Sequence, residues 1–177
     1  MNPRDKRTND FVKHVRSVAG HCRVRIILRK QKKLFLCKEK LNGYFSEPDA
    51  NSSGLIEVAV NRPRSKWLGC LAHEFGHMCQ WFFDMPVYRN CNLGKYGDAA
   101  DVIDKWGSGK DYPDYIVDKA FDAVRAIERD ADEKAALYIE EWRLPVDLNI
   151  YKKDADNYDY SYMMMQTNRK WKYLRRK

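Results

Sequence analysis

Residues that break up a chain are scarce in this sequence. Its 177 residues include six prolines and nine glycines, and no Gly/Ser/Pro-rich linker, internal repeat or low-complexity segment divides it. A chain of this length can bury a hydrophobic core without help from disulfides. We therefore expect a single domain over residues 1–177, with a basic tail at about 168–177.

Long hydrophobic runs are also missing. The mean hydropathy is -0.72, and no stretch is apolar enough to cross a bilayer, so no membrane span is expected. The first ten residues, MNPRDKRTND, are charged and lead into no apolar segment of the kind found in secretory signals. These absences favour a cytoplasmic protein.

The cysteines do not form a pattern typical of disulfides. They are five in number, which is odd, and include no CxxC pair. Reduced, buried thiols are therefore favoured over a disulfide framework, in agreement with a cytoplasmic location. A thiolate metal site at Cys70 or Cys79 is an alternative, although most buried cysteines act as small hydrophobic residues.

Charge is plentiful but unevenly placed, with a net charge of +8. Residues 1–40 hold thirteen Lys/Arg against three Asp/Glu, whereas residues 98–159 hold nine against seventeen. The last ten residues hold six basic residues and no acid. Such polarity can attract nucleic acid or an acidic protein. No nucleic-acid-binding motif accompanies it, so a solvated surface is the favoured interpretation.

The spacing of apolar residues predicts an α+β fold. Alternating or β-branched segments predict strands, and apolar residues at three- and four-residue steps predict helices. The strands expected at 23–29 and 34–37 could pair as neighbours. The full set of expected elements is a helix at 8–19 that stops at Gly20, strands at 23–29, 34–37 and 55–60, a helix at 66–84, a loop at 86–114 with a short helix at 99–106, and a helix at 115–142.

One motif, HEFGH, carries residues with metal chemistry. It places His73 and His77 four residues apart on the predicted helix, so both imidazoles can reach one cation, with Glu74 beside them. Neutral imidazole with a carboxylate and one open position favours zinc. The other two histidines, His14 and His21, are expected to be surface or helix-terminal residues rather than ligands. No histidine follows the motif, so a third ligand is expected to be a carboxylate.

The helix predicted at 115–142 offers two carboxylates for that role. Glu128 and Asp132 lie one turn apart at the edge of an otherwise apolar stripe. A carboxylate facing a core is unfavourable unless it is paired, and a zinc ion with two imidazoles would pair it. One ligand and one supporting hydrogen-bond partner is the simplest interpretation. The alternative is that both carboxylates pair with Arg125, Arg129 or another basic side chain.

These motifs together resemble a known family. HEFGH followed on a later helix by Glu128-x-x-x-Asp132 resembles the gluzincin branch of the zincin metallopeptidases. The longer pattern E-x-x-A-D-x-x-A, which ends at Ala135, with Leu144-Pro145 further on, is similar to the small ImmA/IrrE-type metallopeptidases of phages and bacteria.

The resemblance implies a site and a fold. It assigns His73, His77 and Glu128 to zinc and Glu74 to the general base, with Asp132 as a partner behind the ligands. It implies a zincin-like fold in which a small antiparallel or mixed sheet packs on the HExxH helix and on a second long ligand-bearing helix.

The leading hypothesis is therefore a zinc metallopeptidase that hydrolyses peptide bonds of a protein substrate. The resemblance makes the strand that ends near Val60 the edge on which the substrate docks. The alternative is a catalytically inactive zincin-like binding protein that contacts nucleic acid or an acidic protein through its basic terminal segments.

Two further expectations concern the loop at 86–114. It is long for a connection inside a compact domain, so we expect it to border the substrate cleft and to help set specificity. A tyrosine in or near this loop could donate a hydrogen bond to a developing oxyanion, and the candidates are Tyr96, Tyr112 and Tyr115.

Overall fold

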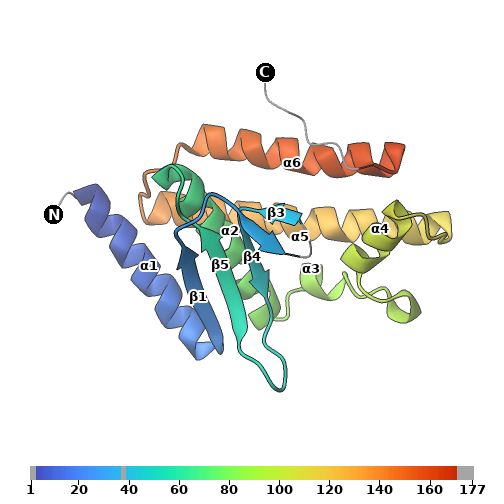
Figure 1. Ribbon diagram of the computed structural model, residues 1–177, viewed down its shortest axis with the longest axis horizontal. Helices are drawn as coiled ribbons and strands as arrows, with labels where there is room; N and C mark the ends of the chain where they lie inside the picture. Colours follow the sequence, from blue (N-terminus) through green and yellow to red (C-terminus); the bar gives the residue numbers. More distant parts are fainter. Residues whose placement is uncertain (1–2, 37–38, 171–177) are drawn as a thin grey trace.

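The chain forms a small sheet with helices packed against it (Figure 1). The computed structural model describes residues 3–36 and 39–170. In chain order the elements are α1 (Pro3–His21), β1 (Val24–Arg29), β2 (Leu34–Leu36), β3 (Glu39–Leu41), β4 (Gly43–Ser46), β5 (Gly54–Ala59), α2 (Arg64–Phe82), α3 (Pro86–Arg89), the 3-10 helix η1 (Gly94–Tyr96), α4 (Ala99–Gly107), α5 (Asp114–Glu141) and α6 (Leu148–Asn168). The expected α+β class is confirmed.

The main sheet has the strand order β1-β5-β4 and is mixed. Strand β5 runs parallel to β1 and antiparallel to β4, while β2 and β3 form a separate antiparallel pair. The expected pairing of 23–29 with 34–37 is therefore wrong. The reason is that β1 aligns its apolar residues with those of β5, with Ile26 opposite Ile56. The strand near Val60 is central, and β4 is the edge strand next to it.

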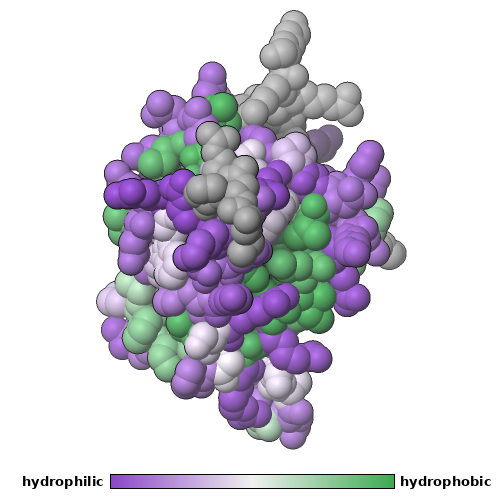
Figure 2. Space-filling model, turned by 90° about the vertical axis from the view of Figure 1, so that its left-hand side faces the viewer, coloured by the Kyte–Doolittle hydropathy of each residue, from purple (hydrophilic) through white to green (hydrophobic). Residues whose placement is uncertain are grey.

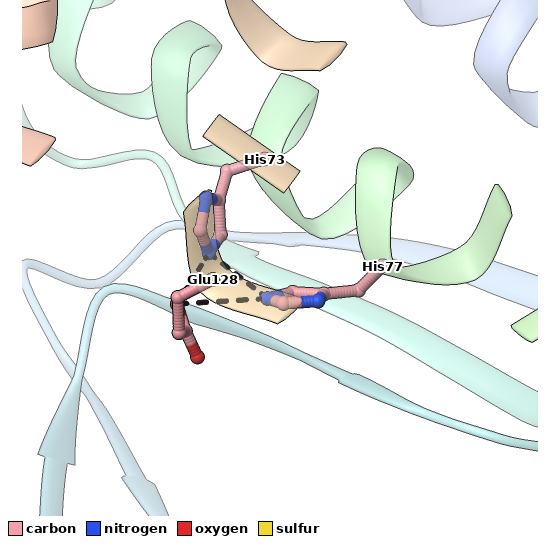
Figure 3. Close-up of side chains that lie close together, drawn as sticks. All are labelled: His73, His77 and Glu128. Atoms are coloured by element: carbon pink, nitrogen blue, oxygen red, sulfur yellow. Dashed lines mark hydrogen bonds and ion pairs between the residues drawn. The ribbon is translucent and has the colours of Figure 1, made fainter. Parts of the chain in front are cut away.

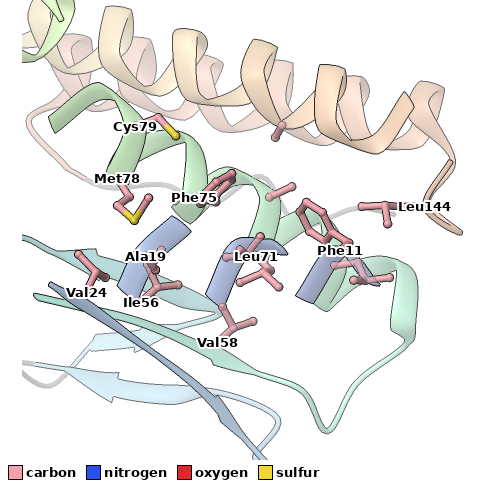
Figure 4. Packing of buried hydrophobic residues seen from close by; sticks show 14 of the residues in the cluster. Phe11, Ala19, Val24, Ile56, Val58, Leu71, Phe75, Met78, Cys79 and Leu144 are labelled. Atoms are coloured by element: carbon pink, nitrogen blue, oxygen red, sulfur yellow. The ribbon is translucent and has the colours of Figure 1, made fainter. Parts of the chain in front are cut away.

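Helices α1 and α2 pack on one face of this sheet and enclose the first hydrophobic core (Figure 4). The apolar residues of α2 recur at helical spacing, and those that are almost fully buried are Leu68, Leu71, Phe75 and Met78. Phe82, expected on the same stripe, is 48% exposed because α2 ends at this residue.

Helix α1 is longer than expected. Its side chains Phe11, Val15 and Ala19 are fully buried, but the helix continues through Gly20 before it ends. The left-handed turn that follows is at Arg23, with φ 57°. Glycine allows such a turn but does not require one, so the expected stop at this glycine is wrong.

Helix α5 connects two hydrophobic cores. Ala135 and Ile139 belong to the first core, whereas Phe121 and Val124 belong to a second core shared with α4 and α6. Helix α6 runs back along α5 after a short turn (Figure 1). No helix was expected in this segment.

A two-bond ion pair and a stacked cation help to hold the last helix in place. Arg125 donates to both carboxylate oxygens of Asp159, at 2.8 and 2.9 Å. After α6, Arg169 lies over the Trp106 ring, 5.0 Å from the ring centroid to Cζ, and donates to the carbonyl oxygen of Trp106 at 2.7 Å. The rest of the expected basic tail, residues 171–177, lies outside the described residues.

The face of the molecule shown in Figure 2 is mostly hydrophilic, with a hydrophobic area on its right and smaller ones on its left, as suits a chain in which 33% of the residues are charged. Among residues 3–36 and 39–170, no helix has both the length and the apolar character needed to cross a membrane.

Candidate metal centre

The backbones of helices α2 and α5 come into contact at the HEFGH motif. A Cβ atom on Gly76 would lie 3.0 Å from the carbonyl oxygen of Ala131 and 3.2 Å from its Cα. Because glycine lacks that atom, the two helices can make this contact. The contact brings His73 and His77 of α2 beside Glu128 of α5 (Figure 3).

The three side chains place their donor atoms around one point. The Nε2 atoms of His73 and His77 are 3.0 Å apart, and Glu128 Oε2 lies 3.3 Å from the first and 3.7 Å from the second. In a tetrahedral zinc site with bonds of about 2.0–2.1 Å, ligand atoms lie ~3.3 Å apart. The observed distances surround this value, so the group could hold a metal ion.

His73 is oriented by a carboxylate and a tyrosine. Asp132 Oδ1 accepts a hydrogen bond from His73 Nδ1 at 2.8 Å, and the Tyr151 hydroxyl donates to the same oxygen at 2.7 Å. The other ring nitrogen, Nε2, then faces Glu128 Oε2 at 3.3 Å. Gly69 leaves room for the tyrosine, because a Cβ there would lie 3.1 Å from the ring.

His77 is oriented by an amide. Gln80 Oε1 accepts a hydrogen bond from His77 Nδ1 at 2.8 Å. The Gln80 Nε2 donates to the carbonyl oxygen of Ile127 and to Asp130 Oδ2, each at 2.7 Å. Gln80 is fully buried, so these bonds satisfy a polar group that water cannot reach. Lys134 also donates to Asp130, at 2.6 Å.

Glu74 lies beside the ligand group without joining it. The residue is only 8% exposed, and the Cys70 thiol donates to its Oε1 at 3.9 Å. Burial raises the pKa of Glu74 and the charge of Glu128 raises it further, against the opposing effect of the two imidazoles. A carboxylate with a raised pKa can both accept and return a proton near neutral pH.

The charges of the ligand group depend on one another. Burial lowers the pKa of His73, but hydrogen bonds to Asp132 and Glu128 outweigh it and hold the pKa well above its usual value. Burial also lowers the pKa of His77, and Glu128 again reverses the effect. For Glu128, burial raises the pKa, but the two imidazoles hold it far below its usual range. Glu128 is therefore ionised, as a metal ligand must be.

The ligand group lies in a cleft of about 2100 Å³. Strand β4 lines one part of it, and α6 contributes Tyr151 and Tyr158. The segment 86–114 contributes Tyr88 and Asp98, among others. The expectation that this segment borders the cleft is confirmed, and its role in specificity stays a prediction.

The arginine alternative does not describe the two carboxylates of α5. Arg125 and Arg129 both bind Asp159, on α6. Glu128 and Asp132 instead contact the histidines.

The remaining histidines lie away from the ligand group. The His14 ring packs on Phe75 and Trp142, with ring centroids 6.0 and 5.0 Å away. His21 Nδ1 lies 2.7 Å from the carbonyl oxygen of Ser17. Both histidines therefore have structural contacts, as expected.

The described cysteines are free thiols, namely Cys22, Cys70, Cys79 and Cys91, and Cys37 lies outside the described residues. Cys79 contacts the Tyr138 hydroxyl at 3.5 Å. Neither Cys70 nor Cys79 belongs to the metal-ligating group, so the thiolate alternative has no support.

The tyrosines chosen from the sequence are not those of the cleft. Tyr96 contacts the ring of Tyr112 and, at 3.5 Å between hydroxyls, Tyr115, and none of the three lines the cleft. Tyr151 was missed because α6 was missed. Its signal was present, since apolar and aromatic residues recur at helical spacing at positions 148, 151, 155, 158, 162 and 165.

No protein-family model, curated protein or solved structure matches this chain. The functional assignment therefore depends on the geometry of the cleft.

Proposed function

We propose that this chain is a zinc-dependent metallopeptidase. The observation that carries the proposal is the group of His73, His77 and Glu128, whose donor atoms lie 3.0 to 3.7 Å apart. The buried carboxylate of Glu74 lies beside them in the same cleft. Each histidine is held by a hydrogen bond at Nδ1, so each Nε2 is available to a metal.

The donor set supports zinc as the metal. Two imidazole nitrogens, one carboxylate oxygen and an open fourth position are typical of catalytic zinc sites. When bound, zinc would polarise the scissile carbonyl group and make water easier to deprotonate. Glu74 would accept the proton from that water and pass it to the leaving amine. His73, His77 and Glu128 would hold the ion and transfer no proton.

The two edge strands of the main sheet differ, and the difference supports β4 as the strand on which the substrate docks. Strand β1 exposes Arg25 and Arg29, and such charges discourage pairing with another chain. Strand β4 carries no charged residue and lines the cleft. A Cβ on Gly43 would lie 3.3 Å from Glu74 Cγ, so an extended peptide paired with β4 would pass beside Glu74. Strand β4 thus replaces the strand near Val60 as the proposed docking edge.

The gluzincin assignment belongs to the same proposal. Glu128 faces both histidines, while Asp132 contacts only His73 of the two. This is the division between ligand and supporting partner that the resemblance to gluzincins and to ImmA/IrrE-type peptidases implies. The proposed substrate is a protein or peptide.

Metal analysis combined with peptide hydrolysis tests the proposal. Purified wild-type protein should carry about one zinc ion per chain, and a chelator should stop cleavage of a random peptide pool read by mass spectrometry. Glu74→Gln should keep the zinc and lower hydrolysis by at least ~10². Glu133→Gln changes an exposed carboxylate of α5, and as the matched control it should alter neither property.

A wild-type protein that neither contains nor binds a metal would contradict the proposal. Unchanged hydrolysis in Glu74→Gln would show that another group is the base. If wild-type protein cleaves nothing, and instead binds nucleic acid with an affinity that falls steeply with salt, the binding-protein alternative is favoured.

A further inference from the structure

At the end of the cleft where α2 begins, Arg62 has a buried nitrogen with no hydrogen-bond acceptor. Its Nη1 atom is shielded from solvent and unpartnered among the residues that the structure describes. Arg62 lines the same cleft as His73 and Glu74. A buried guanidinium N–H without an acceptor is unfavourable. An anion bound at this end of the cleft would supply the acceptor.

Two lysines add positive charge to the same cleft. Lys33 and Lys40 also line the cleft. Lys33 donates to the neutral side chain of Asn42 at 2.5 Å, and Lys40 lies over the Phe35 ring, 5.8 Å from its centroid. Neither contact neutralises a charge. Burial, and then the charge of Arg62, lowers the pKa of Lys33, which agrees with two cations close together.

The first turn of α2 also makes this end of the cleft positive. The helix begins at Arg64 after Pro63, has no side-chain cap, and has no acidic residue in its first turn. Its free N–H groups and its dipole therefore leave a partial positive charge at this end of the cleft. Ser65, in that turn, lines the cleft.

Two acidic residues, Asp147 and Asp154, line the cleft near this end. Asp154 accepts a hydrogen bond from Lys66 through Oδ2 at 2.7 Å, and its Oδ1 is buried. Asp147 caps α6 and accepts from the backbone N–H groups of Asn149 and Ile150. Neither set of contacts involves Arg62, which forms no ion pair with a described residue, so its charge can bind an anionic ligand.

We propose that Arg62, with Lys33 and the amino end of α2, binds a carboxylate of the peptide substrate. The inference rests on the proposed peptidase function and narrows its substrates to peptides with a carboxylate near the scissile bond. Guanidinium groups bind carboxylates in a planar, two-bond geometry. The source is either an Asp or Glu side chain or the terminal carboxylate of the peptide.

The geometry limits where this carboxylate lies in the peptide. Ser65 precedes Glu74 by nine residues (74 − 65), and at ~1.5 Å per residue α2 spans about 14 Å between them. An extended peptide advances ~3.3 Å per residue, so the carboxylate lies within about four residues of the scissile bond. A peptide antiparallel to β4 runs from Ser46 toward Gly43, which places the carboxylate on the carboxyl-terminal side of that bond.

A binding experiment tests the site without hydrolysis. Small probes are titrated into zinc-loaded Glu74→Gln protein while the arginine Nε–H resonances are followed by NMR, with Arg62 identified from its loss in Arg62→Lys. Acetyl-glutamate amide presents a side-chain carboxylate, acetyl-alanine a terminal one, and acetyl-glutamine amide neither. The Arg62 resonance should shift with the carboxylate probes only, and the stronger response names the source. An equal response to the neutral probe, or none to any probe, overturns the inference.

Cleavage of a random peptide pool provides the second test. Wild-type products should be enriched in a carboxylate within about four residues after the cleaved bond. Arg62→Gln should lower kcat/KM for those peptides by at least ~10-fold, chiefly through KM, the scale of a charge-assisted hydrogen bond. Arg64→Gln is the control, since that arginine pairs with Asp5 and does not line the cleft.

The two tests separate the two proposals. Cleavage with no preference for a carboxylate, together with an unresponsive Arg62 resonance, overturns the carboxylate site and leaves the peptidase. A responsive resonance in a protein whose wild type cleaves nothing supports the carboxylate site and counts against the peptidase.

Discussion

The two histidines of the candidate metal centre are held by different means. Behind His73 is a charged acceptor, Asp132, which is bonded in turn to Tyr151 of the last helix. Behind His77 is a neutral acceptor, Gln80, which lies on the same helix and is fully buried. Both arrangements leave Nε2 facing Glu128.

The difference shows how the protein limits negative charge around the ligands. A carboxylate on each histidine would place two charges close to Glu128 and Glu74. The amide of Gln80 orients His77 without adding a further negative charge to this buried group. On the His73 side, the hydrogen bond to Asp132 helps to hold the pKa of the imidazole well above its usual value.

The largest effect on metal binding should come from Glu128, which both histidines share. Glu128→Gln keeps the shape of the side chain but removes its charge, so zinc affinity should fall by more than ~10², beyond the usual effect of a supporting residue. Competition with a chelating dye measures this. Affinity within threefold of wild type would remove Glu128 from the ligand set.

Replacing each support by leucine compares the two sides directly. Gln80→Leu and Asp132→Leu should each lower zinc affinity by ~10- to 100-fold. Gln80→Leu should also reduce the free energy of unfolding of the metal-free protein by about 2–4 kcal/mol. The reason is that His77 Nδ1 and Asp130 would each lose a hydrogen-bond partner in the protein interior.

Denaturant titration measures the stability difference, and Gln166→Leu serves as the control. That amide binds Asp118 at an exposed position. Equal stability of Gln80→Leu and the control would show that the neutral support is not structurally required.

A smaller effect is expected at Tyr151, which touches the metal ligands only through Asp132. Tyr151→Phe should lower stability by about 1 kcal/mol and zinc affinity by only a fewfold. Calorimetry and dye competition measure the two changes. Tyr160→Phe, at a residue 46% exposed, is the control. Loss of zinc as large as in Asp132→Leu would mean that α6 is part of the site rather than a support.

The smallest effect on the metal should come from Asp159, which fixes α6 to α5. Hydrogen bonds from Arg125, ahead of the opposing effect of burial, lower the pKa of Asp159. The stability that this pair contributes is therefore present above the unfolded pKa of ~3.9 and is lost as pH falls through the lower folded value.

Asp159→Asn should therefore cost about 1–3 kcal/mol at pH 7, with a smaller difference from wild type in strong acid and unchanged zinc affinity. Urea titrations at several pH values measure this. A constant difference across the acid range would contradict the ion-pair explanation.

The parts of this molecule that could be predicted depend on local spacing. His73, Glu74 and His77 share a helix, and Glu128 and Asp132 share another, so helical periodicity alone placed them in two groups. Packing of α2 on α5 then brought the two groups together, as a metal site requires.

The parts that could not be predicted depend on contacts between distant residues. The pairing of β1 with β5 was missed because the sequence of a strand does not specify which other strand it pairs with. In the sequence Gln80 is an ordinary polar residue, and its role follows only from its contacts with α5. Arg62 is one of 33 Lys/Arg in the sequence, and only burial distinguishes it.

The separation of the candidate ligands along the chain determines when during folding a metal can bind. His73 and His77 become neighbours as soon as α2 forms, but 50 residues separate His77 from Glu128. Closing a loop of that size costs about 3.5 kcal/mol of chain entropy plus a constant. Since the amino-terminal part of a chain emerges first during synthesis, a new molecule completes its ligand set only after α5 has docked. Tight retention of the metal would therefore mark the molecules that have finished this step.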